Sequence, residues 1–218
     1  MRQKNASGVG GWVERLSSVF TAPSLASMGS MLSGWVLCTA KHTVTGVVRA
    51  DGAEAKKHVT SYHRLFRAAR WSNDAVGRVL MGVIDRVLEP SEVIVAPVDD
   101  TLCRHTGKRI AGASMHHDPL LSTAKTARFH FGHVWVVLSV VVTVTRWKKS
   151  FAVPVLCRMY RSPKVCEREG LTLRKKTELA ADMIGVLASW LPRRKFVLVC
   201  DTAYTTGTVV QTLQPNVE

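Results

Sequence analysis

The chain has 218 residues, 46% of them hydrophobic, and its 30 Lys and Arg residues outnumber its 16 Asp and Glu residues, for a formal net charge of +14. The hydrophobic share is enough for a packed core and excludes wholesale disorder. The positive charge indicates a polyanionic partner, most often nucleic acid and less often an anionic membrane surface. A protein that is merely basic, with no such partner, is the alternative.

The five cysteines are widely spaced and form no Cys-x-x-Cys pair. This pattern argues against a disulfide framework or a zinc ribbon and favours a reducing cytosol. The N-terminal segment lacks the apolar stretch typical of a signal peptide. The apolar run at 134–144 is about half the length of a membrane-spanning helix, so it predicts a buried strand. We therefore expect a cytoplasmic protein with no membrane partner.

The sequence divides into two regions. Residues 1–89 predict a helical DNA-binding region, and residues 90–218 predict alternating strands and helices. LEPSEV (88–93) marks the boundary, because it introduces a proline and a loop or helix-start signal.

Residues 42–72 predict a helix-turn-helix unit, with a short helix, a glycine-containing turn and a longer basic helix. On the longer helix, Tyr62, Leu65 and Phe66 belong to the predicted apolar face. The residues expected to bind DNA fall mostly off that face and are Lys56, Lys57, Arg64, Arg67 and Arg70. An ordinary helical hairpin with a solvated basic face is the alternative.

The elements of the second region follow from β-branched runs and helical periodicity. In chain order they are strands at 91–101, 133–145 and 150–160, a helix at 171–192, a strand at 195–204 and the start of a helix at 205–213. Pro154 places the third strand near a sheet edge or a bulge, and Thr172 is the predicted N-cap of the long helix. The order β-β-β-α-β-α predicts an α/β (α+β) domain with a mixed sheet.

Two of the predicted strands carry acids at or near their carboxyl ends: Asp99 and Asp100 on the first, and Asp201 on the last. An ionised carboxylate at a strand end is costly unless a positive charge compensates it. A divalent cation such as Mg²⁺ is one such charge, because it prefers carboxylate oxygens and keeps waters and substrate phosphates as further ligands. Basic side chains are another, and the closest in sequence are Arg104, Lys108 and Arg109. A simple cap on the following turn is the alternative for each aspartate.

The motifs VDDTLCRHTGKRIAGASMHHDP (98–119) and FVLVCDTAY (196–204), with a strand pair and a helix between them, resemble the DDE-type transposases of bacterial insertion sequences. The resemblance runs from about residue 35 to the end of the chain. It implies a ribonuclease-H-like catalytic domain behind a helical DNA-binding region. It also implies that Asp100 and Asp201 are the first two catalytic acids and metal ligands. Asp99 falls on the opposite face of its strand, and the sequence does not show which neighbour faces the site.

The resemblance further implies Mg²⁺ or Mn²⁺ as cofactor, with ions about 3.5–4 Å apart in the two-metal site of a complete domain. The implied partner is double-stranded DNA, as transposon ends and target DNA, with the nucleoid as the place of action. A homodimer in the DNA complex is one arrangement left open. The family pattern also has a third acid, a glutamate after a fifth strand, and the sequence ends at Glu218 ahead of that position. We therefore expect an incomplete, truncated domain whose activity alone is weak or absent.

Other functions stay open. A non-catalytic DNA-binding remnant, or a regulator of transposition, would still bind DNA while its aspartates would be relics. VDDTL also resembles the aspartate-nucleophile phosphatases, although its acids are adjacent and the glycine is missing. A basic RNA-binding protein is a third alternative, without a recognisable stacking platform. His116, His117 and Asp118 could form a metal cluster, but adjacent histidines usually face apart, so a solvated or phosphate-contacting pair is the expected interpretation.

Overall fold

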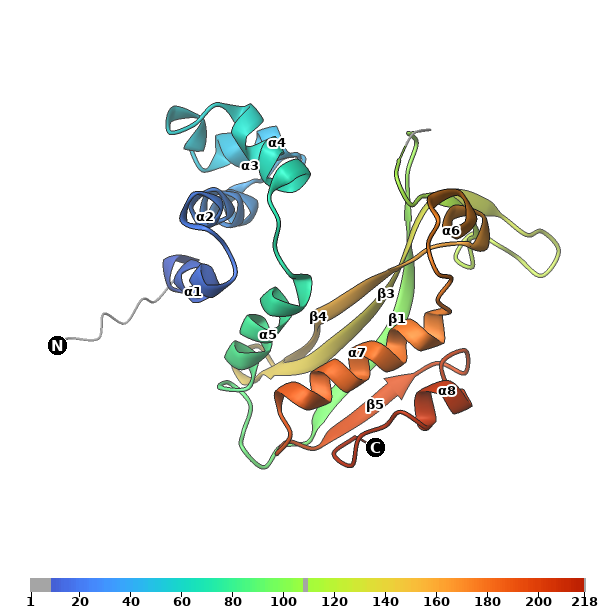
Figure 1. Cartoon of the computed structure of the whole chain (residues 1–218). Helices are drawn as coiled ribbons and strands as arrows, with labels where there is room; N and C mark the ends of the chain where they lie inside the picture. Colours follow the sequence, from blue (N-terminus) through green and yellow to red (C-terminus); the bar gives the residue numbers. More distant parts are fainter. Residues whose placement is uncertain (1–8, 108–109, 218) are drawn as a thin grey trace. The chain divides into compact units, whose positions relative to one another are not determined.

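The computed structural model describes residues 9–107 and 110–217, and the chain clusters into two compact units, Met1–Val79 and Leu80–Glu218 (Figure 1). The first unit is helical, as predicted. Its elements are α1 (Val9–Arg15), η1 (Leu16–Ser18), α2 (Ala22–Leu37), α3 (Val44–Ala50), η2 (Ala53–Ala55) and α4 (Val59–Ala68). No helix in the described ranges is long and apolar enough to cross a membrane.

Helices α3 and α4 are the two helices of the predicted helix-turn-helix unit. The turn between them contains Gly52 at φ 62°, a left-handed conformation that favours glycine. Tyr62 and Leu65 of α4 are buried in a core shared with α2 and α3. Phe66, predicted on the same apolar face, is instead 52% exposed, so the buried stripe of α4 is narrower than the sequence indicates.

The second unit is built on a five-stranded mixed sheet. Its strands are β1 (Ile94–Arg104), β2 (Ser114–His117), β3 (Phe129–Val144), β4 (Lys149–Tyr160) and β5 (Phe196–Cys200). Strand β3 pairs antiparallel with β1 along one edge and with β2 and β4 along the other. Strand β5 pairs parallel with β1. The sheet confirms the predicted mixed α/β class and is consistent with a ribonuclease-H-like fold.

Helix α7 (Lys176–Trp190) lies along this sheet (Figure 1). Alternate residues of β1 are buried in one core with the apolar side of α7, which sets the face of the sheet that α7 covers. The other helices of this part of the chain are α5 (Asn73–Ile84), η3 (Thr145–Trp147), α6 (Pro163–Glu169) and α8 (Gly207–Val210). Met81 and Ile84 of α5, with Leu88, join the same core, so this unit begins ahead of residue 90.

Three details differ from the predicted element order. Strand β2 and helix α6 were not predicted, because a four-residue strand and a seven-residue helix are too short for a clear periodic signal. The long helix begins at Lys176 rather than near Thr172. Its first turn is closed by Glu178, whose carboxylate accepts a 2.8 Å hydrogen bond from the Lys175 N–H.

The prediction from Pro154 is confirmed. Strand β4 pairs with β3 alone among the described strands, and the register shifts between Leu138 and Ser139, opposite Pro154. A residue without an N–H is tolerated at such a bulge on an edge strand.

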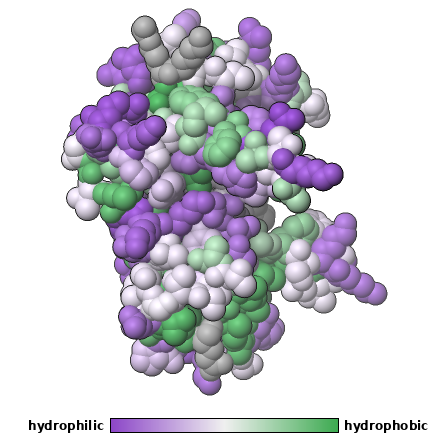
Figure 2. Space-filling view, turned by 90° about the vertical axis from the view of Figure 1, so that its right-hand side faces the viewer, coloured by the Kyte–Doolittle hydropathy of each residue, from purple (hydrophilic) through white to green (hydrophobic). Residues whose placement is uncertain are grey.

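Hydrophilic side chains cover much of the face drawn in Figure 2, and hydrophobic side chains gather in smaller patches between them. The apolar residues that stay exposed on the sheet include Val95 of β1 and Val199 of β5. Both alternate with residues that pack into the core beneath α7.

Candidate active site

Asp99 and Asp100 differ sharply in their surroundings. Asp99 is exposed, and its Oδ1 accepts a 2.7 Å hydrogen bond from the Asp100 N–H. Asp100 follows the buried alternation of Ile94, Ala96 and Val98 and therefore lies on the face of the sheet that α7 covers. Asp100 is thus the member of the pair that faces α7, and Asp99 faces the opposite side of the sheet.

Both carboxylate oxygens of Asp100 have partners from distant parts of the chain. The ammonium Nζ of Lys176, the first residue of α7, lies 2.7 Å from Oδ2. The hydroxyl of Tyr204 donates to Oδ1 at 2.8 Å. The side chain of Asp100 is 24% exposed and that of Lys176 is 38% exposed, so the pair lies at the edge of the core and within reach of solvent.

Arg104, the described one of the three basic neighbours in sequence, pairs with another acid. Arg104 pairs with Asp118 instead of Asp99 or Asp100, with Nε 2.6 Å from Oδ2. Lys108 and Arg109 lie outside the described residues. The prediction that Arg104 compensates the charge of Asp99 or Asp100 is therefore wrong, because its side chain points to the β2–β3 connection.

Asp201 stands at the end of the neighbouring parallel strand. The β1–β5 register ends at Val98 opposite Cys200, so Asp100 and Asp201 both follow the last paired residues at the same edge. Asp201 is exposed, and its Oδ1 accepts a 3.0 Å hydrogen bond from the Ala203 N–H. This bond is the turn cap foreseen as the alternative role of the residue, and it engages one oxygen of the carboxylate.

Tyr204 connects the two aspartates. Its backbone N–H donates to the Asp201 carbonyl at 3.1 Å, while its side chain is buried and reaches Asp100. The pKa of the Tyr204 phenol is raised, first by burial, then by the hydrogen bond to Asp100, and further by the charges of Asp100, Asp99 and Asp201. All three carboxylates therefore act on one buried hydroxyl, which stays protonated and donates.

His116 of β2 borders the Asp100–Lys176 pair. Its Nε2 is 2.8 Å from the hydroxyl of Ser114, and its ring centroid lies 6.1 Å from that of Tyr160. Burial lowers the pKa of His116, and the charges of Lys176 and His133 lower it further against the opposing charge of Asp100. Burial and the neighbouring positive charges therefore favour the neutral form of the imidazole.

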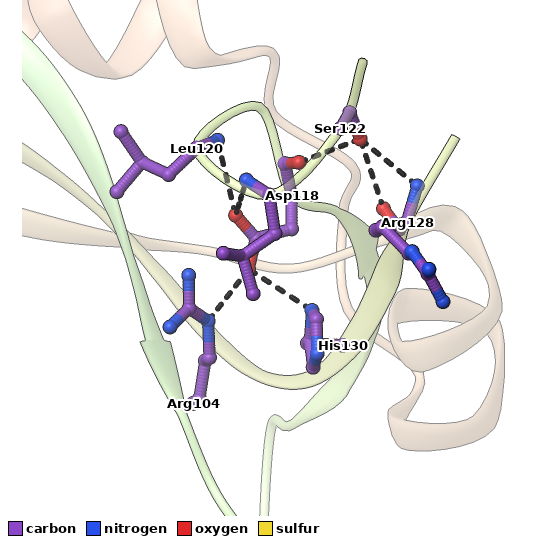
Figure 3. Close-up of polar contacts among 7 residues, drawn as sticks. Arg104, Asp118, Leu120, Ser122, Arg128 and His130 are labelled. Atoms are coloured by element: carbon purple, nitrogen blue, oxygen red, sulfur yellow. Dashed lines mark hydrogen bonds and ion pairs between the residues drawn. The ribbon is translucent and has the colours of Figure 1, made fainter. Parts of the chain in front are cut away.

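The His-His-Asp run does not form a metal cluster. Asp118 is buried, and its Oδ2 contacts two basic side chains (Figure 3). These are Nε of Arg104 and, at 3.0 Å, Nδ1 of His130. The other oxygen of Asp118 accepts from the backbone N–H groups of Leu120 and Leu121 at 3.1 and 3.3 Å. Asp118 thereby fixes the start of the β2–β3 connection, and the Arg104 hydrogen bond is the main reason why its pKa is lowered.

The donor chemistry at Asp100 and Asp201 fits a hard divalent cation. Two carboxylates at one sheet edge are the ligand type that Mg²⁺ and Mn²⁺ prefer, and Oδ2 of Asp100 already contacts a cationic group. Within residues 9–107 and 110–217, no group of three or more His, Cys, Asp or Glu side chains is arranged to hold a metal ion. Two protein carboxylates would leave the remaining positions of an ion to water and substrate.

Comparison with known families decides the class of the protein. The family model described as DDE superfamily endonuclease matches residues 15–217. The chain belongs to this family. A search of curated proteins found no match. Membership supports nuclease or transposase-type activity on DNA, and endonucleases of this superfamily generally use divalent metals.

The helical unit of this family member carries an exposed basic surface. Arg64, Arg67 and Arg70 are exposed, as is Lys56, whereas Lys57 is half-buried with Nζ 3.0 Å from the Ser27 hydroxyl. A cavity of about 410 Å³ lies beside Lys57 and Arg64, and its hydroxyl-bearing lining residues are Ser24, Ser27 and Ser61. Cations and hydroxyl donors around a cavity suit a phosphate group.

The sheet unit has a second basic cavity, of about 260 Å³. Arg158, Arg161 and Arg174 line it, together with apolar residues of β4, α6 and α7. Asp182 pairs with Arg158 at 3.0 Å and lies 3.9 Å from Arg174. The three arginines give this cavity a net positive lining.

Sequence reasoning missed Lys176, Tyr204 and His116 as parts of the site. Tyr204 stands in the CDTAY motif, three residues after Asp201, and that spacing was the available signal. Lys176 offered none, because RKK (174–176) resembles any basic helix start. His116 lies on β2, a strand too short to be predicted.

Proposed function

We propose that this chain is a DNA transposase of the DDE type, which performs metal-dependent strand cleavage and strand transfer at transposon ends. The observation that supports this best is the parallel pairing of β1 with β5, because Asp100 and Asp201 both lie just past its last paired residues, Val98 and Cys200. Tyr204 touches both residues. The family match adds the reaction class.

In this proposal, Asp100 and Asp201 hold the divalent ion, and Tyr204 orients the Asp100 carboxylate. When bound, Mg²⁺ or Mn²⁺ would activate the attacking water or 3′-hydroxyl and stabilise the charge that develops on the phosphate. The residues of the chain bind and align the phosphodiester, and nearby Lys and Arg side chains neutralise its charge. Water opens the strand at the transposon end, and the freed 3′-hydroxyl then attacks target DNA.

The helical region would bind the transposon ends. We assign double-stranded DNA binding to the helix-turn-helix unit of α3 and α4, with contacts from Lys56, Lys57, Arg64, Arg67 and Arg70. Exposed cations supply affinity through release of DNA counterions, which weakens as salt rises. A basic protein of this kind would act at the nucleoid in the cytoplasm, and a homodimer could hold two transposon ends.

A plasmid-nicking assay tests the proposal. The purified chain is incubated with supercoiled DNA that carries the flanking sequence of its gene, in Mg²⁺, Mn²⁺ or a chelator. Nicking by the chain, even at a low level, should require metal and be lost in Asp100→Asn and in Asp201→Asn. Asp99→Asn is the matched control, because it removes the adjacent but exposed carboxylate, and it should retain activity. Nicking that is indifferent to both site variants would contradict the assignment.

A non-catalytic DNA-binding regulator is the second candidate. The observation that favours it is that both oxygens of Asp100 are already engaged, by Lys176 and Tyr204. Such a protein would bind transposon ends in a salt-dependent way with or without metal. This candidate would be favoured if Asp100→Asn bound DNA as tightly as the wild type and if the wild type did not nick DNA in any metal.

A further inference from the structure

Lys176 holds the position at Asp100 where a metal ion would bind. Its ammonium Nζ is 2.7 Å from Oδ2, and it also lies 5.7 Å from the ring centroid of Tyr160. The other oxygen of Asp100 accepts from Tyr204 and is held in place by a buried side chain. Oδ2 is therefore the oxygen that an incoming cation can take, and a cationic side chain is already on it.

An ammonium and a divalent ion cannot share this oxygen at low cost. A Mg²⁺ ion binds a carboxylate oxygen at about 2.1 Å, so the two positive charges would lie within a few ångströms of one another. Like charges at such a distance repel strongly in a partly buried site. The lysine side chain is the part that can move, because it has four rotatable bonds, whereas the Glu178 hydrogen bond to the Lys175 N–H fixes the start of α7.

We propose that Lys176 is the resident counter-ion of Asp100, and that it competes with the divalent metal and then passes to a phosphate of the DNA. The inference rests on the proposed function, in which Asp100 is a metal ligand. Lys176 is 38% exposed, so an ammonium released from Asp100 can reach a phosphate in solvent. A DNA phosphate that draws Lys176 away frees Asp100 for metal, and metal that takes Asp100 frees Lys176 for DNA. Metal and DNA then bind with positive coupling, which is reciprocal by linkage.

Manganese affinity provides the test, because it requires no turnover. Free Mn²⁺ is measured by electron paramagnetic resonance during titration of the full chain. We expect Lys176→Met to bind Mn²⁺ about five- to tenfold more tightly than the wild type, since the competitor is gone. Lys175→Met is the matched control, because it removes the same charge from the adjacent exposed position, and it should change the affinity less than about twofold. Lys176→Arg keeps a cation and should behave like the wild type.

A double-stranded oligonucleotide then tests the coupling. In the wild type, DNA should tighten Mn²⁺ binding, and in Lys176→Met the same DNA should tighten it less, because no ammonium remains to be displaced. Each protein gives a ratio of its Mn²⁺ dissociation constants without and with DNA. Comparing the ratio of the wild type with that of Lys176→Met separates the contribution of Lys176 to the coupling from that of direct contact between phosphate and ion. Circular dichroism and thermal unfolding confirm that each variant is folded.

The outcomes separate the inference from the function on which it rests. Unchanged or weaker Mn²⁺ binding in Lys176→Met, with binding still lost in Asp100→Asn, would overturn the counter-ion role and leave the metal site standing. Mn²⁺ binding that persists in Asp100→Asn would overturn both, because the ion would then bind elsewhere. Tighter binding in Lys176→Met that Asp100→Asn abolishes would support both.

Discussion

The hydroxyl of Tyr204 donates a 2.8 Å hydrogen bond to Oδ1 of Asp100, a residue 104 positions earlier in the chain. The bond joins the segment after β5 to the part of β1 just past Val98, the last residue of β1 that is paired with the parallel strand β5. Tyr204 is almost completely buried, so the orientation of the Asp100 carboxylate is set by the core of the protein. A catalytic carboxylate that is held in this way meets its ligands in a fixed geometry.

Tyr204→Phe tests this relationship. The ring would stay in the core while the hydroxyl is removed, so we expect the free energy of unfolding to fall by only about 1 kcal/mol. Metal-dependent nicking should fall more than tenfold, because Asp100 loses the group that orients it. Denaturant titration measures the first quantity and the nicking assay the second. Tyr160→Phe is the control, since its ring would remain near Lys176. Equal losses of nicking in both variants would show that Tyr204 has no specific role.

The ion pair between Asp118 and Arg104 should make the stability of the folded protein depend on pH. Its pKa in the folded protein is lowered from an ordinary value of 3.8, mainly by the Arg104 hydrogen bond. The unfolded chain therefore binds more protons than the folded chain between the two pKa values, and stability rises with pH across that window. The contribution is fully present above the ordinary pKa and is lost as the pH falls through the folded-state pKa.

We therefore expect Asp118→Asn to lower the free energy of unfolding at pH 7 and to differ less from the wild type below pH 4. Urea titrations at a series of pH values measure the difference. Asp51→Asn is the control. The ion pair between Asp51 and the exposed Lys56 is long, at 4.0 Å, so the loss of the Asp51 charge should have a small effect on stability at every pH. A gap between Asp118→Asn and the wild type that stays constant down to pH 2 would contradict the ionic origin.

The basic surface of α4 predicts the salt dependence of DNA binding. Replacing Arg64 and Arg67 by alanine should weaken binding to any duplex and reduce the slope of log K against log salt by about one for each phosphate that the variant no longer neutralises. Fluorescence anisotropy at several salt concentrations gives both values. Arg15→Ala removes an exposed charge from α1 of the same unit and should leave the slope unchanged. An unaltered slope in the α4 variant would mean that DNA binds at another surface.

Much of the sheet could be predicted from the sequence, because β1, β3 and β4 are long β-branched runs bounded by charged or polar turns. Asp201 follows the end of β5, as these runs predicted, but the strand-end position predicted for Asp99 and Asp100 is wrong, because β1 continues to Arg104 through its pairing with β3. Strand pairing was not predictable in this way, and it determines that Asp100 and Asp201 lie at one edge. Register also decides which of Asp99 and Asp100 faces α7, and one-residue shifts reverse that choice.

The electrostatic partners were the least predictable feature of the site. Sequence proximity suggested Arg104 as the partner of the strand-end acids, but β1 continues through Arg104 and carries its side chain to the β2–β3 connection. The true partner, Lys176, is 76 residues from Asp100 and approaches only because α7 begins at the edge of the sheet. Long-range contacts of this kind depend on tertiary structure and leave no local pattern.

The central claim is that Asp100 and Asp201 share a divalent ion, and anomalous diffraction from crystals grown with Mn²⁺ tests it most directly. The account predicts an anomalous peak about 2.1–2.2 Å from an oxygen of each carboxylate, with waters completing an octahedron and Lys176 turned away from Asp100. Saturating Mn²⁺ with no peak at these residues, and with Lys176 still paired to Asp100, would contradict it.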